Sequence, residues 1–188
     1  MATIKKNKIL VCGAGSIGKR HIENLIIFNQ KVIVWRERKE KNNEILKKYK
    51  IPVTNDLESA IKDSDAIIIA NATDRHLKII NKAIKYKKNM YIEKPISNSM
   101  RGVKSLINNT KKLKVEVGFQ LRNHPNLVFL RKIINRSKLK SVYYYRFSMG
   151  YRLDLWRKRT DYRKSYTSDH SRGGGALFEL IHQIDLAI

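Results

Sequence analysis

Residues 8–18, KILVCGAGSIG, constrain the fold more than any other part of the chain. Four consecutive apolar residues, 9–12, run directly into the three glycines Gly13, Gly15 and Gly18. An unbroken apolar run is typical of a strand buried on both faces of a parallel sheet. Glycines at this spacing permit a tight turn, close approach of the backbone to a pyrophosphate, and close packing of a helix on the strand. The pattern therefore predicts a strand, a phosphate-binding turn and a helix, in that order.

This turn also predicts a class of ligand. The free N–H groups at the start of the helix, together with its dipole, favour a negatively charged group. We therefore expect a dinucleotide, with contacts from Gly13, Gly15, Ser16, Ile17 and Gly18. A GxGxxG spacing alone is a weak signal, but the preceding strand, the following helix and the place near the N-terminus all agree with it. The alternative is a glycine turn with a purely structural role.

After this turn, short apolar runs follow one another along the chain, separated by segments with a helical pattern. They predict five further strands. The strands are expected at 31–35, 51–53, 66–70, 89–92 and 115–119. Helices are expected at 17–29, 39–50, 56–61 and 98–113, and residues 71–76 are expected to lead into a further helix that runs through Tyr86. Strands that alternate with helices are typical of an α/β fold with a parallel sheet. The predicted fold is a Rossmann-type doubly wound sheet in a first domain of residues 1–120.

The pattern changes after residue 120. We expect a helix at 125–137, a β-prone run at 140–149, a polar loop at 150–172 and a helix with an apolar stripe at 176–186. One helix and one long strand cannot bury a second core. We therefore expect residues 121–188 to be the beginning of a truncated α+β substrate domain.

Composition limits the partners. The 40 Lys and Arg residues against 16 Asp and Glu give a formal charge of +24, a value that often signals nucleic acid. The lysines are spread over helical stretches rather than gathered with aromatic residues, so we expect no specific nucleic-acid partner and a mild attraction of anionic ligands. No apolar run approaches the roughly 18 residues of a membrane span, and no secretory signal or metal cluster is visible. The single cysteine, Cys12, excludes an internal disulfide and suits a cytoplasmic location.

The end of the second predicted strand bears on the choice of cofactor. In this fold an acidic residue there binds the ribose hydroxyl of NAD, whereas an arginine accommodates the 2′-phosphate of NADP. The chain offers Arg36, Glu37 and Arg38. Two guanidinium groups beside one carboxylate favour NADP, with Arg36 and Arg38 as its contacts. The alternative is that one or both arginines are simply solvated.

Four motifs together resemble the Gfo/Idh/MocA oxidoreductases. They are GAGSIG at 13–18, NATDRH at 71–76, EKP at 93–95 and GGGALFELIHQID at 173–185. The resemblance covers nearly the whole chain and implies hydride transfer between NAD(P) and a hydroxyl or carbonyl carbon, usually of a sugar. It implies further cofactor contacts from Asn71, Thr73, His76, Glu93, Lys94 and Pro95. The family's usual Thr-Pro after the fourth strand is Asn71-Ala72 here.

The resemblance also implies the catalytic residues. Lys94 would bind the reacting oxygen, and His182 would be its acid/base partner. Oxidation of an alcohol requires a base for the hydroxyl proton, and reduction requires the same group as an acid, which suits lysine and histidine. Family members commonly carry Asp and His four residues apart on the last helix, whereas Glu179 and His182 are three apart here. Asp185 is a further carboxylate, so the residue that orients the imidazole stays open.

The polar loop gives an expectation about the substrate. Residues 150–156 and 161–166, together with 179–185, resemble a subgroup linked with bacterial surface-sugar and nonulosonic-acid pathways. An arginine there binds a carboxylate or phosphate and a phenol binds hydroxyl groups, which suits an acidic sugar. The expected substrate contacts are Arg122, Tyr162, Arg163, Tyr166, Glu179 and Asp185. The alternatives are a structural arm that packs on a neighbouring subunit and, for Arg122, an ordinary surface charge.

Two other function classes remain open. A non-catalytic dinucleotide-binding module is one, because the second domain is expected to be incomplete. A nucleic-acid-binding protein is the other, and salt-sensitive DNA retention that ignores NADPH would support it. The expected partners are otherwise a small-molecule sugar and, in a full-length form, a second copy of the chain.

Overall fold

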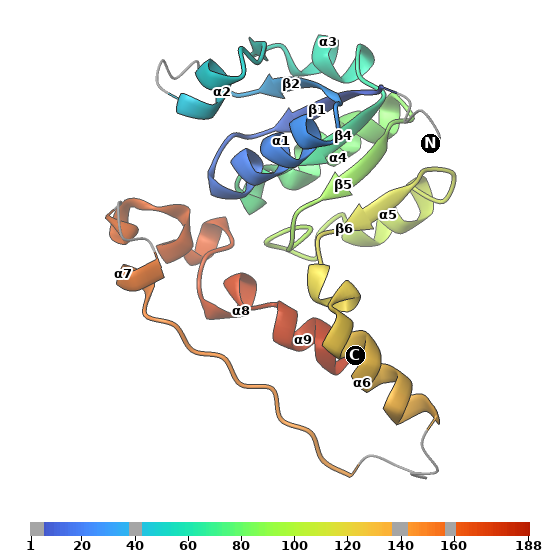
Figure 1. The fold of residues 1–188 in the computed structure, drawn as a ribbon, viewed down its shortest axis with the longest axis vertical. Helices are drawn as coiled ribbons and strands as arrows, with labels where there is room; N and C mark the ends of the chain where they lie inside the picture. The colour runs from blue at the N-terminus through green and yellow to red at the C-terminus, as the bar shows by residue number, and fades with distance from the viewer. Residues whose placement is uncertain (1–5, 38–42, 137–142, 157–160) are drawn as a thin grey trace. The chain divides into compact units, whose positions relative to one another are not determined.

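The computed structural model describes residues 6–37, 43–136, 143–156 and 161–188 (Figure 1). The chain divides into two compact units, Met1–Val117 and Gly118–Ile188, and each is described by itself.

The first unit is built on a parallel sheet with the strand order β3-β2-β1-β4-β5-β6 (Figure 1). The strands are β1 Lys8–Cys12, β2 Lys31–Trp35, β3 Val53–Thr54, β4 Ala66–Ile69, β5 Asn89–Ile92 and β6 Val115–Val117. Every pairing in this sheet is parallel. The predicted α/β doubly wound sheet is confirmed. The strand order changes direction between β1 and β4. In sheets of this kind, ligands bind at that switch point, outside the carboxyl ends of the two strands.

The register aligns the ends of the strands. One row across the sheet consists of Thr54, Trp35, Cys12, Ile69, Ile92 and Val117. The loops that follow these residues therefore leave the sheet at one edge. The glycine turn, the segment after β4 and the EKP motif after β5 all begin there.

Helices connect the strands in the alternation expected of this fold. They are α1 Ser16–Ile27, α2 Glu44–Lys48, α3 Leu57–Lys62, α4 His76–Lys85 and α5 Val103–Asn109, with a 3₁₀ turn, η1, at Thr73–Arg75. Asp56 caps α3, since its carboxylate accepts from the N–H groups of Glu58 and Ser59 at 3.1 Å. The fifth helix is shorter than predicted and lies within 98–113.

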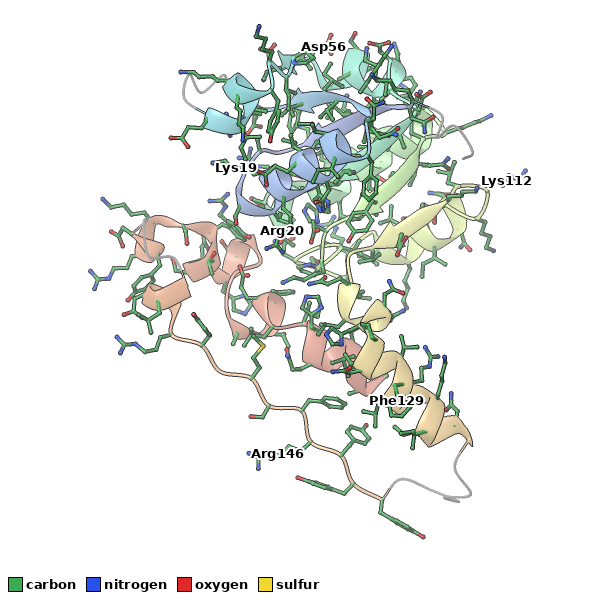
Figure 2. All side chains as sticks on the ribbon, viewed as in Figure 1. Lys19, Arg20, Asp56, Lys112, Phe129 and Arg146 are labelled. Carbon is green, nitrogen blue, oxygen red and sulfur yellow. The ribbon has the colours of Figure 1, made fainter. Side chains whose placement is uncertain are left out.

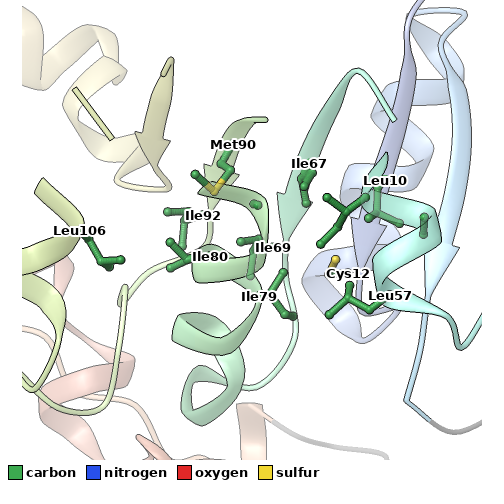
Figure 3. Close-up of a cluster of buried hydrophobic side chains, with 13 residues drawn as sticks. Leu10, Cys12, Leu57, Ile67, Ile69, Ile79, Ile80, Met90, Ile92 and Leu106 are labelled. Carbon is green, nitrogen blue, oxygen red and sulfur yellow. The ribbon is translucent and has the colours of Figure 1, made fainter. Parts of the chain in front are cut away.

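The core of the first unit has one layer on each face of the sheet. Successive strand residues point to opposite faces, so Leu10 and Cys12 join one layer while Val11 joins the other. The larger layer is filled from α3, α4 and α5 (Figure 3). The smaller contains Ile22 of α1 and Leu46 of α2. The smaller layer, which also contains Val11 and Ala14, packs α1 against β1.

The second unit contains short helices. They are α6 Pro125–Arg136, α7 Leu153–Trp156, α8 Ala176–Glu179 and α9 His182–Ala187, with 3₁₀ turns η2 Gln120–Asn123, η3 Tyr162–Lys164, η4 Tyr166–Ser168 and η5 His170–Arg172. The predicted helix at 125–137 is found as α6, from which Phe129 projects with most of its surface exposed (Figure 2). In the part of the chain that the structure describes, no helix has the length and apolar character needed to cross a membrane.

Two predictions for the second unit are wrong. Residues 143–149 of the predicted strand at 140–149 pair with no other strand within the described ranges, and Tyr143 is 95% exposed. A β-prone run needs a neighbouring strand to satisfy its backbone groups. The single helix predicted at 176–186 is interrupted between α8 and α9, where Leu180 has φ −105° and ψ 26°. Glu179 and His182 therefore lie on two different helices.

Candidate dinucleotide site

The glycine turn joins β1 to α1 and has no room for larger residues at two positions. Gly13 has a φ of +106°, and a Cβ there would lie 2.8 Å from the carbonyl oxygen of Ala70. A Cβ at Gly18 would overlap the carbonyl group of Gly13, 2.9 Å from its carbon atom. Gly15 differs, because a Cβ there would have no heavy atom within 4 Å. The turn is thus packed on the sheet side and open beside Gly15.

The start of α1 meets the requirements of an anion site. Gly15 is its N-cap, no side chain caps it, and its first turn contains no acidic residue. The helical hydrogen bonding begins with the N–H of Lys19, which donates to the carbonyl of Gly15 at 2.9 Å. The N–H groups of Ser16 and Ile17 precede it and have no helical acceptor. Lys19 and its neighbour on the helix add positive charge near this end (Figure 2).

Asn43 supports the turn and was not predicted. Its side-chain Nδ2 donates to the carbonyl oxygen of Ala14 at 3.1 Å, and the residue is buried. Asn43 is the residue before α2. The sequence pattern placed it inside a helix at 39–50, so nothing marked its contact with the turn.

Asn71, two residues after β4, supplies polar atoms beside the turn. Its backbone nitrogen lies 2.9 Å from the position of a Cβ on Gly13, so the two segments are in contact. Its side-chain Oδ1 and Nδ2 are buried and have no hydrogen-bond partner among the described residues. An amide left in this state costs about 1–3 kcal/mol. A polar ligand in the turn would supply the missing partners. Thr73 is buried close by, at the start of η1.

His76 joins the segment after β4 to the segment after β5. Its Nδ1 lies 2.9 Å from the carbonyl oxygen of Pro95, and its Nε2 lies 3.0 Å from that of Asn71. The ring is 1% exposed. Burial lowers the pKa of His76, and the two carbonyl contacts oppose that effect. The structure thus directs both ring nitrogens to the protein backbone.

The EKP motif begins where β5 ends. The N–H of Glu93 donates to the carbonyl of Ile69 at 2.9 Å, which continues the pairing of β4 with β5. The Oε1 of Glu93 lies 2.7 Å from Nε2 of His21, a residue of α1. The His21 ring contacts the Tyr91 ring edge-on, with 5.2 Å between centroids. Burial and the nearby Glu93 carboxylate raise the pKa of Tyr91 to about 12. Lys94 follows, half-buried, and its peptide bond to Pro95 is cis.

The end of β2 places one carboxylate beside an arginine from another loop. The N–H of Arg36 donates to the carbonyl of Thr54 at 3.0 Å. The carboxylate of Glu37 forms an ion pair with the guanidinium of Arg75, a residue of η1. Arg75 was not predicted as a site residue. Arg38, the second predicted arginine, lies outside the described residues.

In the second unit, Arg122 and Asp185 bind each other. The Arg122 Nε lies 2.9 Å and 3.0 Å from the two carboxylate oxygens of Asp185, whose side chain is 5% exposed. The side chain of His182 has other neighbours: its Nε2 lies 3.3 Å from Nε2 of Gln120, and its ring is edge-on to Phe119. The carboxylate of Asp185 is therefore directed to a guanidinium in this structure.

The predicted substrate loop is folded against the triple glycine. Tyr162 and Arg163 lie in η3, where the guanidinium stacks over the phenol ring at 5.7 Å. Tyr166 begins η4, and its carbonyl oxygen lies against Gly174, where a Cβ would overlap it. The N–H of Gly175 donates to the carbonyl of Thr167 at 2.9 Å. These contacts bring the loop and the start of α8 together.

The predicted site residues thus form two groups. The glycine turn, Asn71, Thr73, His76 and the EKP motif gather at the carboxyl edge of the sheet in the first unit, whereas His182, Arg122 and Asp185 gather in the second. Within the described ranges, no three His, Cys, Asp or Glu side chains lie close enough together to hold a metal ion.

Comparison with known proteins identifies the family. The model of the GFO_IDH_MocA oxidoreductase family, NAD-binding Rossmann fold, matches residues 7–120. Myo-inositol 2-dehydrogenase of Thermotoga maritima is 30% identical over 145 residues, covering 70% of this chain and 42% of that protein. The chain therefore spans less than half of this relative.

Two solved structures show the same fold. Scyllo-inositol dehydrogenase from Lactobacillus casei, with bound NAD(H) and scyllo-inositol, superposes with a TM-score of 0.65 at 22% identity, over 73% of this chain and 43% of that one. GenD2 from gentamicin A biosynthesis, in complex with NAD, gives 0.73 at 18% identity, over 99% and 54%. On the family match, this chain belongs to the GFO_IDH_MocA oxidoreductases, a family with an NAD-binding Rossmann fold.

Proposed function

We propose that this chain binds NAD(P) and belongs to an enzyme that oxidises or reduces a sugar or sugar derivative at a hydroxyl or carbonyl carbon. Two features that lie together at the glycine turn carry the proposal. The start of α1 is open and uncapped, and the buried side-chain amide of Asn71 has no hydrogen-bond partner among the described residues. A pyrophosphate would accept from the N–H groups of Ser16 and Ile17. The remaining contacts in this part of the site are proposed at Gly13, Gly18, Asn71, Thr73, His76, Glu93, Lys94 and Pro95.

Lys94 and His182 carry the proposed chemistry of the alcohol. When bound, the nicotinamide supplies the hydride acceptor or donor. The ammonium of Lys94 stabilises negative charge on the reacting oxygen, and the imidazole of His182 takes or returns the hydroxyl proton. The nearby Gln120 amide lies within reach of the His182 ring and fixes its orientation. Arg122 and Asp185 act as one ion-paired unit, because separating them would leave a buried carboxylate unpaired.

The proposed cofactor preference is for NADP. An acidic residue after β2 selects NAD when its carboxylate accepts from the ribose hydroxyl. Here the Glu37 carboxylate is already paired with Arg75, which reduces its negative potential. Arg36 stands next to it with a second positive charge. A 2′-phosphate would meet a net positive surface at this point.

The proposed substrate is an acidic sugar of the kind found in surface-sugar and nonulosonic-acid pathways. Support comes from the motif resemblance and from the guanidinium of Arg163, which stacks on Tyr162 and offers its N–H edge to a carboxylate. Tyr166, Glu179 and Arg122 are the other proposed contacts. Some relatives are named as inositol dehydrogenases, and inositols are neutral cyclic polyols. A neutral polyol is therefore the alternative substrate.

A fluorescence titration tests the cofactor proposal on the 188-residue chain. NADPH and NADH are titrated into the wild type, Arg36→Ala and the matched control Arg131→Ala, which removes the same charge from the exposed face of α6. A lost charge-assisted hydrogen bond is worth about 1.5–3 kcal/mol, so Arg36→Ala should weaken NADPH binding about tenfold or more and leave NADH nearly unchanged.

Three outcomes are distinguishable. If Arg36→Ala leaves the affinity for both dinucleotides unchanged, the NADP preference is wrong. Failure of the wild type to bind either dinucleotide overturns the proposed function. Tight binding without turnover of inositols or acidic sugars assigns the chain to a non-catalytic dinucleotide-binding module.

A further inference from the structure

Lys94 lies between two residues that are each held by a histidine. On one side, the Oε1 of Glu93 is 2.7 Å from Nε2 of His21. On the other, the carbonyl oxygen of Pro95 is 2.9 Å from Nδ1 of His76. Both contacts are sheltered, since His76 is almost completely buried and the His21 and Glu93 side chains are 17% and 11% exposed. The short segment that carries Lys94 is therefore held at both ends.

The two histidines come from two different helices beside the proposed dinucleotide site, α1 and α4. His21 belongs to α1, the helix whose first turn would bind the pyrophosphate. His76 is the first residue of α4, and its second nitrogen lies 3.0 Å from the carbonyl oxygen of Asn71. Asn71 in turn contacts Gly13 of the turn. Each histidine thus connects the Lys94 segment to a different part of the phosphate site.

If His21 and His76 served only to fill space, their imidazole rings would not be needed. A buried polar ring is unfavourable unless its nitrogens are hydrogen-bonded, and an apolar side chain would fill the same volume without that requirement. The carbonyls of Pro95 and Asn71 can only accept, and a neutral imidazole has a single N–H. The His76 ring lies between the two carbonyls, so its N–H donates to one of them at a time, and the Nδ1–H tautomer donates to Pro95.

We propose that His21 and His76 are positioning residues that fix Lys94 relative to the glycine turn. The proposal rests on the proposed role of Lys94 in the reaction. Neither histidine touches the reacting atoms, and each acts by holding the main chain next to Lys94. Misplacement of a reacting group by about 1 Å can reduce a rate about 100-fold, so this restraint bears directly on the chemistry.

Matched amide substitutions separate positioning from packing. The amide nitrogen of glutamine reaches about as far as Nε2 of histidine, and that of asparagine about as far as Nδ1. His21→Gln therefore keeps a donor for Glu93, and His21→Asn loses it. His76→Asn keeps a donor for Pro95, and His76→Gln loses it. The two members of each pair differ by one methylene group, and His124→Gln, on an exposed residue of the second unit, is a control for the labelled protein.

The readout is the NMR signal of the Lys94 Cε methylene, assigned by Lys94→Arg and recorded with and without NADPH. In the wild type, NADPH should shift this signal. At saturating NADPH, the shift should fall by more than half in His21→Asn and His76→Gln. The NADPH dissociation constant should change less than threefold in His21→Asn, because the glycine turn is intact. His21→Gln and His76→Asn should restore the shift.

The proposal is overturned if the Lys94 signal and its response to NADPH are the same in all four variants and in the wild type. This holds even where urea unfolding shows that a variant has lost stability. Failure of the wild type to bind NADPH has a different meaning, because it removes the proposed function. The Lys94 signal in the ligand-free chain still tests the restraint in that case, since it should move in His21→Asn and His76→Gln alone.

Discussion

Gly15 and Gly18 should respond to alanine in opposite ways, because the structure gives them different surroundings. A methyl group on Gly18 would overlap the Gly13 carbonyl, which is backbone and cannot rotate away. Relief requires α1 to move by roughly 1 Å, and overpacking of this kind costs about 1–3 kcal/mol. The better helix propensity of alanine returns up to about 1 kcal/mol. The net loss of stability for Gly18→Ala is expected to be about 1–2 kcal/mol.

Gly15→Ala should leave the stability almost unchanged. Its φ of −72° suits any residue, and no atom lies within 4 Å of the new methyl group. Alanine is a poorer N-cap than glycine, but it also restricts the unfolded chain, and these effects of up to about 1 kcal/mol each oppose one another. The methyl group would occupy the open space where a pyrophosphate approaches. We expect at least about a tenfold loss of dinucleotide affinity, equivalent to about 1.4 kcal/mol.

Urea unfolding followed by circular dichroism gives the stabilities, and NADPH fluorescence gives the affinities. NADPH binding by Gly15→Ala that equals the wild type, or wild-type stability of Gly18→Ala, would show that these surroundings do not determine the two effects. A large loss of stability in Gly15→Ala would show that the space beside the turn is not open.

Three further predictions concern titratable groups. The Tyr86 hydroxyl and the Lys82 ammonium hold the pKa of Glu58 near 2 instead of 4.5, so Glu58→Gln should lose less stability than the wild type as pH falls from 4.5 to 2 in urea unfolding. Burial lowers the pKa of His76, so the unfolded chain protonates first and stability falls below about pH 6.5, by up to about 1.4 kcal/mol per pH unit. His76→Asn should flatten that slope between urea series at pH 7.5 and 5.5. Burial raises the pKa of the Cys12 thiol, so Ellman's reagent should react with it only under unfolding conditions, and rapid reaction in native buffer would contradict its place in the core.

Much of the first unit could be predicted because its signals are local. The apolar run at residues 9–12 pairs with β2 on one side and β4 on the other, and Gly13 and Gly18 after it occupy positions where a Cβ would clash. The Asp56 cap likewise depends on residues two and three positions away. In the second unit, the run at 143–149 has β-prone residues but no neighbouring strand in the described ranges, and a strand depends on its partner as much as on its own sequence.

The supporting residues of the site could not be predicted, since their roles arise from contacts distant in sequence. His21 binds Glu93 across 72 residues, and Asn43 reaches Ala14 across 29. A single histidine on a helix, or an asparagine before one, has no pattern that marks such a partner. Arg75 was visible within its motif, but its pairing with Glu37 joins the segments after β4 and β2, two strands that β1 separates in the sheet.

A map of NADPH binding on the backbone amides of the isotope-labelled chain tests whether the dinucleotide binds at the glycine turn. We expect saturable shifts that are largest at Gly15, Ser16, Ile17 and Asn71, the residues around the open start of α1. Shifts confined to lysine-rich helix surfaces, or no saturable shift at any of these four amides, would contradict this expectation.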